Sequence, residues 1–309
     1  MLTDLKPLVD AAVNNYRSLT TLSAAFLNQW DQFLIHCTGY DLIPPMWLRY
    51  RIQGTPDIDT FIRAGLYSRW SIEHALGTQA KCVTDFPKIL DFGCGCGRTL
   101  RWFRDISKEV SLHGTDIDSE SIEWCRKNHT YASFENNLFE PPLPYPEDSF
   151  ELIYALSVFT HLTEEAQFAW LKELKRILKP GGMLLLTFLG YQPEKVQGHS
   201  KRPVPKLFGK RILGLANMDM WSFLDEPEIQ QLEDRGFVFV PYGIGPLGKD
   251  YGITYHRRDY ITQQFSEILE VHEYLPDAFC GYLDVALLQH GTGPNERGNR
   301  RQGQRRRRD

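Results

Sequence analysis

The sequence predicts an α/β fold in which helices cover both faces of one doubly wound, mostly parallel sheet. Three observations support this prediction. A glycine-rich turn links an apolar run to a helical pattern at 88–103, apolar runs and amphipathic segments then alternate, and a Lys-Pro-Gly-Gly stop at 179–182 precedes a fully apolar run. The chain has 309 residues, of which 42% are hydrophobic, so it can bury the core of one such domain with insertions.

The glycine-rich turn is the first chemically informative element. A short apolar run ends in Asp91, and Gly93, Gly95 and Gly97 follow at alternate positions before the helical pattern begins. Glycine adopts positive φ and leaves no Cβ between the backbone and a ligand. A turn of this kind at the start of a helix therefore predicts a site for a planar or anionic, nucleotide-like ligand.

The spacing of these glycines argues against two common nucleotide sites. A dinucleotide fingerprint, G-x-G-x-x-G/A, needs a small third residue, and the chain has Arg98 or Leu100 at that position. A phosphate-binding P-loop needs Gly-Lys followed by Ser or Thr, and no such sequence follows the turn. The pattern that remains is D-x-G-x-G-x-G followed by a bulky residue.

The following segments continue the alternation of strands and helices. A second strand at 111–116 ends in Asp116, about 20 residues past the turn, where Rossmann-type folds place a ribose-binding carboxylate. A buried strand is expected at 149–156, and an amphipathic helix at 163–178 begins with acids and ends with bases. The apolar run at 183–189 is expected to form the next strand.

Four motifs thus occur in order over residues 88–189: the glycine turn, the acid after the second strand, the run S-F-E-L-I-Y-A-L-S-V-F-T-H-L, and L-K-P-G-G-x-L-L-L-T. Together they resemble the class I S-adenosylmethionine-dependent methyltransferases, and within them a bacterial branch often associated with sugar and glycoconjugate biosynthesis. The resemblance implies a Rossmann-like, mostly parallel seven-stranded sheet with an antiparallel last strand. It also implies S-adenosylmethionine as the cofactor.

The cofactor-binding positions of that family have counterparts in this chain. The turn backbone would pass under the methionine and ribose, Asp91 would hold the amino group, and Asp116 would accept both ribose hydroxyls. Ile117 would pack on the adenine, and either Asn136 or Asn137 would meet its amino group, since Asn-Asn replaces the usual Gly-Asp. The expected cofactor-binding residues are Asp91, Gly93, Cys94, Gly95, Gly97, Arg98, Asp116, Ile117, Asn136, Asn137, Leu138 and Ser157.

Two histidines are candidates for a catalytic base. Methyl transfer from a sulfonium mainly requires alignment of donor and acceptor, and a hydroxyl acceptor also needs a base near neutral pH. His161 follows the strand at 149–156, at the sheet edge where ligands bind in open α/β folds, although a structural role at a helix start is the alternative. His256 is the second candidate.

These observations predict an O-methyltransferase that acts on a small polar acceptor, and the resemblance points to a sugar or glycoconjugate. The alternatives are an N-methyltransferase of a small molecule, a non-catalytic cofactor-binding protein and an RNA methyltransferase. The sequence makes no prediction about the oligomeric state.

Regions outside the motifs complete the expected organisation. After the strand at 183–189, we expect a helix at 257–265 and the last two strands at 267–274 and 281–290. The alternative makes 236–244 the sixth core strand and 251–276 the insertion. The expected division is an N-terminal helical cap at 1–80, a methyltransferase domain at 81–290 with a substrate cap inserted at 190–256, and a disordered Arg-rich tail at 291–309.

Charge and composition limit the remaining function classes. The tail carries seven Arg against two acids and is +5, so the formal charge of −4 leaves −9 on the rest of the chain, which argues against a nucleic-acid partner. The Cys94-x-Cys96 spacing does not suit zinc, so no metal is expected. No run approaches the roughly 18 apolar residues of a membrane helix, and no signal peptide is recognisable, so we expect a cytoplasmic protein.

Overall fold

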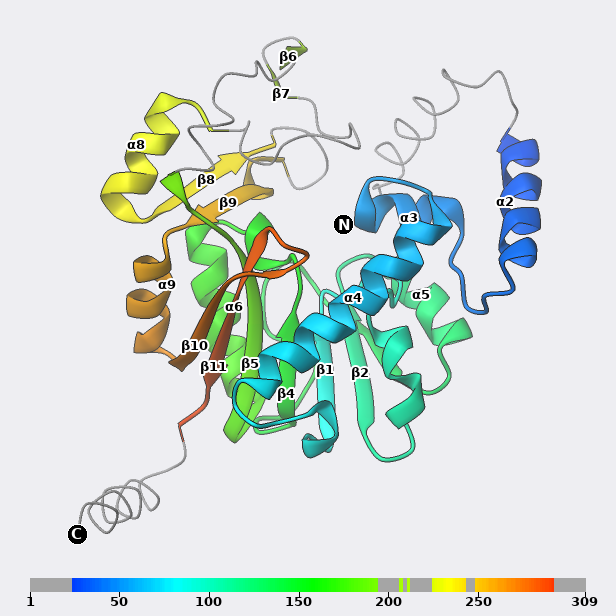
Figure 1. Cartoon of the computed structure of the whole chain (residues 1–309), viewed down its shortest axis with the longest axis horizontal. Helices are drawn as coiled ribbons and strands as arrows, with labels where there is room; N and C mark the ends of the chain where they lie inside the picture. Colours follow the sequence, from blue (N-terminus) through cyan, green and yellow to red (C-terminus); the bar gives the residue numbers. More distant parts are fainter. Residues whose placement is uncertain (1–23, 194–205, 208–209, 212–223, 243–247, 292–309) are drawn as a thin grey trace.

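Seven strands form the continuous path of the sheet, in the order β10-β11-β5-β4-β1-β2-β3 (Figure 1). Strands β1 to β5 pair in parallel, whereas β11 is antiparallel to both of its neighbours, β5 and β10. The predicted doubly wound, Rossmann-like sheet with an antiparallel last strand is thus confirmed. The strands are β1 (Lys88–Phe92), β2 (Ser111–Asp116), β3 (Ser133–Asn136), β4 (Phe150–Ala155), β5 (Leu178–Gly190), β10 (Glu270–Phe279) and β11 (Leu283–Gln289).

This computed structural model describes residues 24–193, 206–207, 210–211, 224–242 and 248–291. The Arg-rich tail and parts of the predicted N-terminal and inserted caps lie outside these ranges. Within the described ranges, no helix combines the length and the apolar character that crossing a membrane requires. The short strands β6 (Lys206–Leu207) and β7 (Lys210–Arg211) pair with each other.

The sheet has two strands more than the seven predicted. The end of β5 pairs in parallel with β9 (Gly252–His256), and β9 pairs antiparallel with β8 (Phe237–Pro241). The parallel pairing joins Leu189 to Tyr255 and Gly190 to His256. The inserted segment therefore continues the core sheet, because β5 runs past the end of β4 and offers a free edge there.

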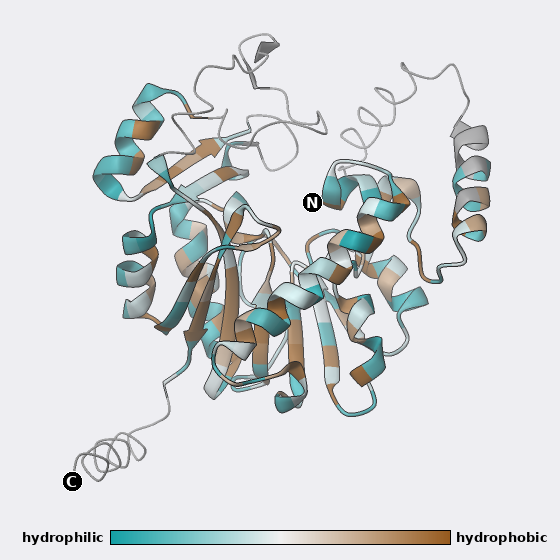
Figure 2. Cartoon of the chain, viewed as in Figure 1, coloured by the Kyte–Doolittle hydropathy of each residue, from teal (hydrophilic) through white to brown (hydrophobic). Residues whose placement is uncertain are grey.

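The helices cover the two faces of the sheet as expected from the apolar strands, which are brown between mostly teal outer helix faces in Figure 2. Strand β5 has an unbroken run of buried residues from Met183 to its end because both of its faces are covered. One face packs against α4 (Ile58–Gly77), the 3₁₀ helix η2 (Leu100–Ile106) and α5 (Ser119–Asn128). The other face packs against α6 (Glu164–Ile177) and α9 (Arg258–Gln264).

Local signals explain where several helices begin. The Thr163 side chain accepts the N–H of Ala166 at the start of α6, and Asp57 accepts that of Thr60 at the start of α4. The helix expected after the glycine turn is a 3₁₀ helix, η2. Helix α8 (Glu226–Arg235) precedes β8 and ends at Gly236, which has φ 75°.

The N-terminal helices α2 (Ala24–Thr38) and α3 (Met46–Gln53) precede α4. Helix α3 is not among the elements that the sequence predicts, because the Pro44-Pro45 pair directly before it favours a break in the chain. Pro45 instead occupies the N-cap position, where its missing N–H costs nothing. The buried Arg49 of α3 pairs with the buried Asp31 of α2, with Nη2 and Oδ1 2.5 Å apart.

The strand pairing decides between the two assignments of the C-terminal strands. Strand β10 lies beside β11, in the place of the sixth core strand, and α9 precedes it. Strand β8, at the position of the alternative 236–244 strand, pairs only with β9 among the described strands. The alternative is therefore wrong, since 236–244 does not enter the core path.

Candidate cofactor and acceptor site

The glycine turn follows β1 at the carboxyl edge of the sheet, and the Gly93 N–H donates to Thr115 O at 2.8 Å. Gly93 has φ 80°, and a Cβ there would lie 2.3 Å from Cγ2 of Val158. Gly95 has φ 53°, and its Cβ would lie 2.8 Å from Cγ2 of Ile52. The missing Cβ atoms thus make room for two protein side chains, whereas the sequence suggested that they make room for a ligand.

Asp116 ends β2 and fixes this turn. Its Oδ2 accepts the Gly95 N–H at 2.7 Å, and its Oδ1 accepts the Asp118 N–H at 2.8 Å. Burial raises the pKa of Asp116 to about 6, although these N–H groups act in the opposite direction. Each carboxylate oxygen keeps a further lone pair, so the same side chain can accept hydroxyl groups of a ligand.

Asp91 is buried on β1, with 3% of its surface exposed, beside its register partner Tyr154 on β4. Its Oδ2 has no partner at hydrogen-bond geometry among the described residues, although the nearby Tyr154 hydroxyl acts to lower the pKa of the carboxyl. Burial raises the pKa of Asp91 to about 8. A buried acceptor of this kind suits a ligand that brings a cationic amino group.

The two asparagines after β3 have different partners. The Asn136 side chain donates to Asp116 O at 2.6 Å, and the Asn137 side chain donates to Leu138 O at 2.8 Å. The buried Oδ1 of Asn137 has no hydrogen-bond partner among the described residues, so Asn137 is the better acceptor for an adenine amino group. Leu138 is 69% exposed, and Ile117 is half-buried beside Asp116.

The remaining predicted residues lie around the same turn. Ser157, just after β4, has φ 57° and donates its N–H to Thr187 Oγ1 at 2.8 Å. Gly97 packs against His129, and Arg98 is half-buried and acts electrostatically on Asp91. The structure thus brings the predicted cofactor positions together at one sheet edge.

The two cysteines of the turn have no metal-ligand set around them. Burial raises the pKa of Cys94 and of Cys96 well above the usual thiol value, so both are thiols at neutral pH. Across the ranges that the structure covers, no three His, Cys, Asp or Glu side chains lie together as a metal site.

Helix α3 covers the glycine turn, which the sequence did not indicate. Besides the contact of Ile52 with Gly95, Arg51 binds Asp118 and Glu120 with N–O distances of 2.8 and 2.6 Å. Arg63 and Tyr67 of α4, in contrast, are exposed. The segment M-W-L-R-Y-R-I-Q alternates apolar and polar residues over most of its length, a period typical of a strand, so its pattern gave no signal for the helix α3.

His161 lies in the 3₁₀ helix η3 (Phe159–His161), beyond the end of β4. Its Nδ1 lies 2.8 Å from Gly252 O. A carbonyl oxygen only accepts, so Nδ1 carries the proton and the neutral ring keeps its lone pair on Nε2. Burial lowers the pKa of His161, which keeps the ring neutral at pH 7. The ring is therefore oriented as a proton acceptor.

The structure does not support His256 as a base. The residue is fully buried on β9, and burial lowers its pKa to about 3. Its Nε2 lies 2.9 Å from Gln167 Oε1, and the Gln167 amide donates to Phe159 O and Leu162 O. His256 is thus a buried structural residue, and its hydrogen bonds brace the segment that carries His161.

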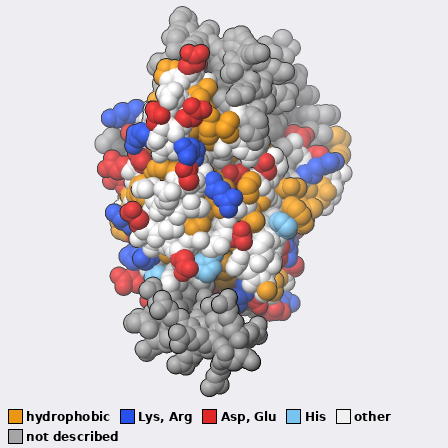
Figure 3. All heavy atoms as spheres, turned by 60° about the vertical axis from the view of Figure 1, so that its left-hand side comes forward, with side chains coloured by type: hydrophobic (Ala, Val, Ile, Leu, Met, Phe, Trp, Pro, Cys, Tyr) orange, Lys and Arg blue, Asp and Glu red, His pale blue; other side chains and the backbone are white. Residues whose placement is uncertain are grey.

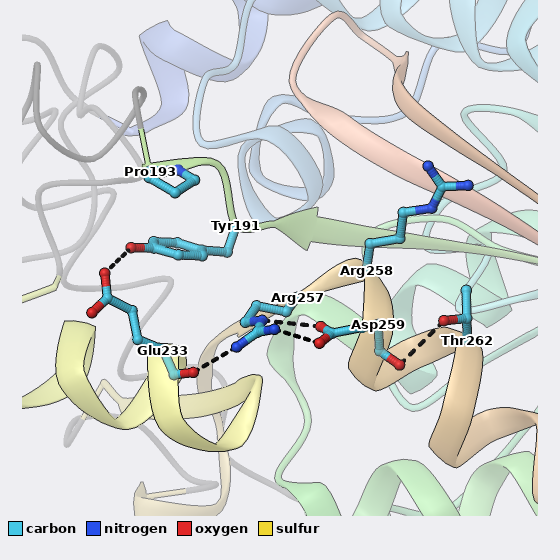
Figure 4. Close-up of a pocket in the computed structure, with 7 residues that line it drawn as sticks. All are labelled: Tyr191, Pro193, Glu233, Arg257, Arg258, Asp259 and Thr262. Atoms are coloured by element: carbon cyan, nitrogen blue, oxygen red, sulfur yellow. Dashed lines mark hydrogen bonds and ion pairs between the residues drawn. The ribbon is translucent and has the colours of Figure 1, made fainter.

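A separate cavity of about 650 Å³ lies on the cap side of the end of β5 (Figure 4). Arg257 pairs with Asp259 and donates to Glu233 O, while the Tyr191 hydroxyl donates to the Glu233 carboxylate. None of the predicted site residues lines this cavity. Its lining residues are Tyr191, Pro193, Glu233, Arg257, Arg258, Asp259 and Thr262.

Comparison with known proteins identifies the class of the central segment. Residues 89–182 match the family model described as a methyltransferase domain. A fatty-acid O-methyltransferase of Mycolicibacterium smegmatis is 27% identical over 48% of this chain and 50% of its own length. A probable S-adenosylmethionine-dependent methyltransferase of the same organism is 28% identical over 53% of this chain and 60% of its own length.

Two further matches broaden this picture. A tRNA N(3)-cytidine methyltransferase METTL2 of Bos taurus is 28% identical over 35% of this chain and 33% of its own length. The crystal structure of PH0226 protein from Pyrococcus horikoshii shares the fold, with a TM-score of 0.50 at 13% identity over 78% of this chain and 98% of that one. The chain thus spans between a third and three fifths of the length of the three curated methyltransferases named above.

The match of residues 89–182 to a methyltransferase domain and the Rossmann-like fold around them support an S-adenosylmethionine-dependent methyltransferase. The predicted cofactor, S-adenosylmethionine, agrees with this match, and Asp91 Oδ2 and Asn137 Oδ1, which have no hydrogen-bond partner among the described residues, fit its amino groups. These names do not include a sugar acceptor, so the predicted sugar branch is not confirmed.

The raised pKa of Asp91 predicts proton release on cofactor binding. At pH 7 the ligand-free carboxyl is mostly protonated, since its pKa is about 8, and a cationic amino group beside it favours the carboxylate. We expect binding of S-adenosylmethionine at pH 7 to release close to one proton. Calorimetry in two buffers of different ionisation enthalpy measures this release, and Asp91→Asn should abolish it.

The same pKa predicts the direction of a stability change. The folded chain holds the Asp91 proton more tightly than the unfolded chain, so this contribution is complete below about pH 4 and is lost as the pH rises to about 8. Asp91→Asn should therefore raise the Tm of the ligand-free protein more at pH 8 than at pH 5. Equal changes at the two pH values would contradict the assignment.

Proposed function

We propose that the whole chain is an S-adenosylmethionine-dependent O-methyltransferase of a small acceptor, with His161 as the general base. The observation that carries this proposal is the hydrogen bond from His161 Nδ1 to Gly252 O, which leaves Nε2 as the proton acceptor. The neighbouring Val158 packs on Gly93 of the cofactor turn, so the base belongs to the same edge of the sheet as the methyl donor.

In the proposed reaction, the acceptor hydroxyl gives its proton to His161 Nε2 as its oxygen attacks the methyl carbon. When bound, the cofactor would supply an electrophilic methyl group, with the neutral thioether as the leaving group. Asp91, Asp116 and Asn137 hold the two ends of the cofactor, and the glycine turn passes beside it. Residues of β8 and β9 then form the acceptor side of the site.

A small acceptor agrees better with the charge of this chain than RNA does. The formal charge is −9 outside the tail at 291–309, and on the face in Figure 3 acidic and basic side chains are interspersed. Phosphate backbones are bound by clustered Lys and Arg. The tail lies outside the described residues, so its deletion tests this point: a small-molecule enzyme keeps its activity and its weak salt dependence, and an RNA enzyme does not.

The proposed function is tested with cofactor that carries a ¹³C-labelled methyl group. The full chain is incubated with this cofactor and a deproteinised cell extract, and the products are separated by mass. The ¹³C chemical shift then distinguishes O-methyl from N-methyl products. An O-methyl product supports the proposal, an N-methyl product favours the alternative acceptor, and no transfer to any extract component contradicts both.

A further inference from the structure

A pair of tyrosines from the inserted segment surrounds the ring of His161. Tyr251 stacks on it, with ring centroids 5.1 Å apart and planes inclined by 27°. The hydroxyl of Tyr242 lies 3.1 Å from His161 Nδ1, and the two tyrosine rings meet edge to face at 5.5 Å. The backbone N–H of Tyr242 also donates to Tyr251 O, which ties the two residues together.

Which of the two groups donates in the hydrogen bond between Tyr242 and His161 follows from the second partner of His161 Nδ1. Gly252 O is the closer partner of Nδ1, at 2.8 Å, and can only accept, so Nδ1 must carry a proton. The Tyr242 oxygen therefore accepts from the same N–H and does not donate to it. Two acceptors on Nδ1–H favour a positive ring over a neutral one.

We propose that Tyr242 is a positioning residue for the general base, which holds His161 in the Nδ1–H tautomer and raises the basicity of Nε2. This inference rests on the proposed role of His161 and adds to it the residue that adjusts the base. Burial alone would make the imidazole a weak base, and the two oxygen acceptors partly offset that effect. The inserted segment thus orients the base and also lines the acceptor side of the site.

The groups around the ring support this assignment. Tyr251, which directly precedes β9 and bridges to Leu162 after η3, has its pKa raised to about 12 by burial and by the charge of Asp116. Strand β5 offers no titratable side chain near its carboxyl end. Glu164 of α6 is engaged by Tyr260 and Arg235, and the exposed Lys249 and Asp250 precede Tyr251. Tyr242 and Tyr251 are therefore the titratable neighbours that can act on the base.

The structure offers a matched control for the removal of this hydroxyl. The Tyr131 hydroxyl lies 3.0 Å from Nδ1 of His129, which forms a second tyrosine–histidine pair outside the acceptor side. Tyr131→Phe removes the same oxygen atom from the same kind of contact. It should change the signals of His129 and leave those of His161 unchanged.

The test uses the full chain labelled with ¹⁵N and ¹³C at its nine histidines, with His161 assigned by comparison with His161→Gln. We expect the Nδ1–H tautomer in the unmodified protein and a lower pKa of His161 in Tyr242→Phe than in Tyr131→Phe. The acid limb of turnover, followed by transfer of labelled methyl to the extract, should move to lower pH. The plateau rate should fall about 3- to 10-fold because the base is weaker.

Two outcomes would overturn the proposal. The first is an unchanged or higher pKa of His161 in Tyr242→Phe. The second is an Nε2–H tautomer in the unmodified protein, which needs no variant and so remains decisive if Tyr242→Phe does not fold. Failure of the proposed function is a separate result: His161→Ala would keep its turnover, while the effect of Tyr242 on the pKa of His161 would persist.

Discussion

Replacing His161 with alanine is expected to lower methyl transfer by about 10²- to 10⁴-fold, the usual contribution of a positioned base. The affinity for S-adenosylmethionine should stay nearly constant, because the cofactor contacts come from Asp91, Asp116 and the glycine turn. Turnover is measured as labelled methyl transferred to the extract, and affinity by calorimetry. A loss of turnover without a loss of cofactor affinity is the result expected for a general base.

His256→Gln is the informative companion of this variant. His256 is buried and braces the same segment through Gln167, so its replacement is expected to lower the Tm while changing turnover less than His161→Ala does. If the folded His256 variant lost more turnover than His161→Ala, the assignment of the base to His161 would be wrong. Unchanged turnover in His161→Ala would remove the base from the mechanism.

Replacing Asp116 with alanine is expected to weaken cofactor binding by about 10²-fold or more. Two backbone N–H groups lose their acceptor, the glycine turn loses its brace from Gly95, and the ribose hydroxyls lose a carboxylate. Calorimetric titration with S-adenosylhomocysteine measures the effect without an acceptor. Because burial raises the pKa of Asp116 to about 6, the affinity of the unmodified protein should also fall as the pH drops below that value.

Asp225→Ala provides the control for a general loss of stability. Asp225 belongs to the capping box at the start of α8, so its removal should cost about 1 kcal/mol and leave cofactor affinity unchanged. If both variants weaken binding equally, the loss reflects stability alone. If Asp116→Ala binds the cofactor normally, the ribose assignment is wrong.

The core fold was predictable because its signals are local. The apolar runs of β1, β4 and β5, the glycine turn and the caps of α6 each lie within a few consecutive residues. Strand β9 gave no such signal, since its five residues become a strand by pairing with β5 on one side and β8 on the other. The pairing of Leu189 with Tyr255 joins residues 66 positions apart (255 − 189), and no local pattern encodes it.

The sequence predicted which residues lie at the site better than it predicted what each of them does. The residues around Asp91, Asp116 and Asn137 do meet at one edge, because the ends of parallel strands meet there. The sequence could not separate His161 from His256, since the difference between them is burial. Nor could the sequence show that the side chains of Val158 and Ile52 leave no room for a Cβ at Gly93 and Gly95. These side chains come from other parts of the chain.

The parallel pairing of Gly190 with His256 has a consequence for the ancestry and engineering of this chain. The residues that open and close the insertion are neighbours across one strand spacing, about 4.8 Å. A segment whose two ends meet in this way can be lengthened, exchanged or shortened without moving β5 or α9. Chimaeras that exchange 191–255 between related methyltransferases, and that keep both junctions and the three residues in contact with His161 (Tyr242, Tyr251 and Gly252), are therefore a direct route to altered acceptor selectivity on an unchanged donor site.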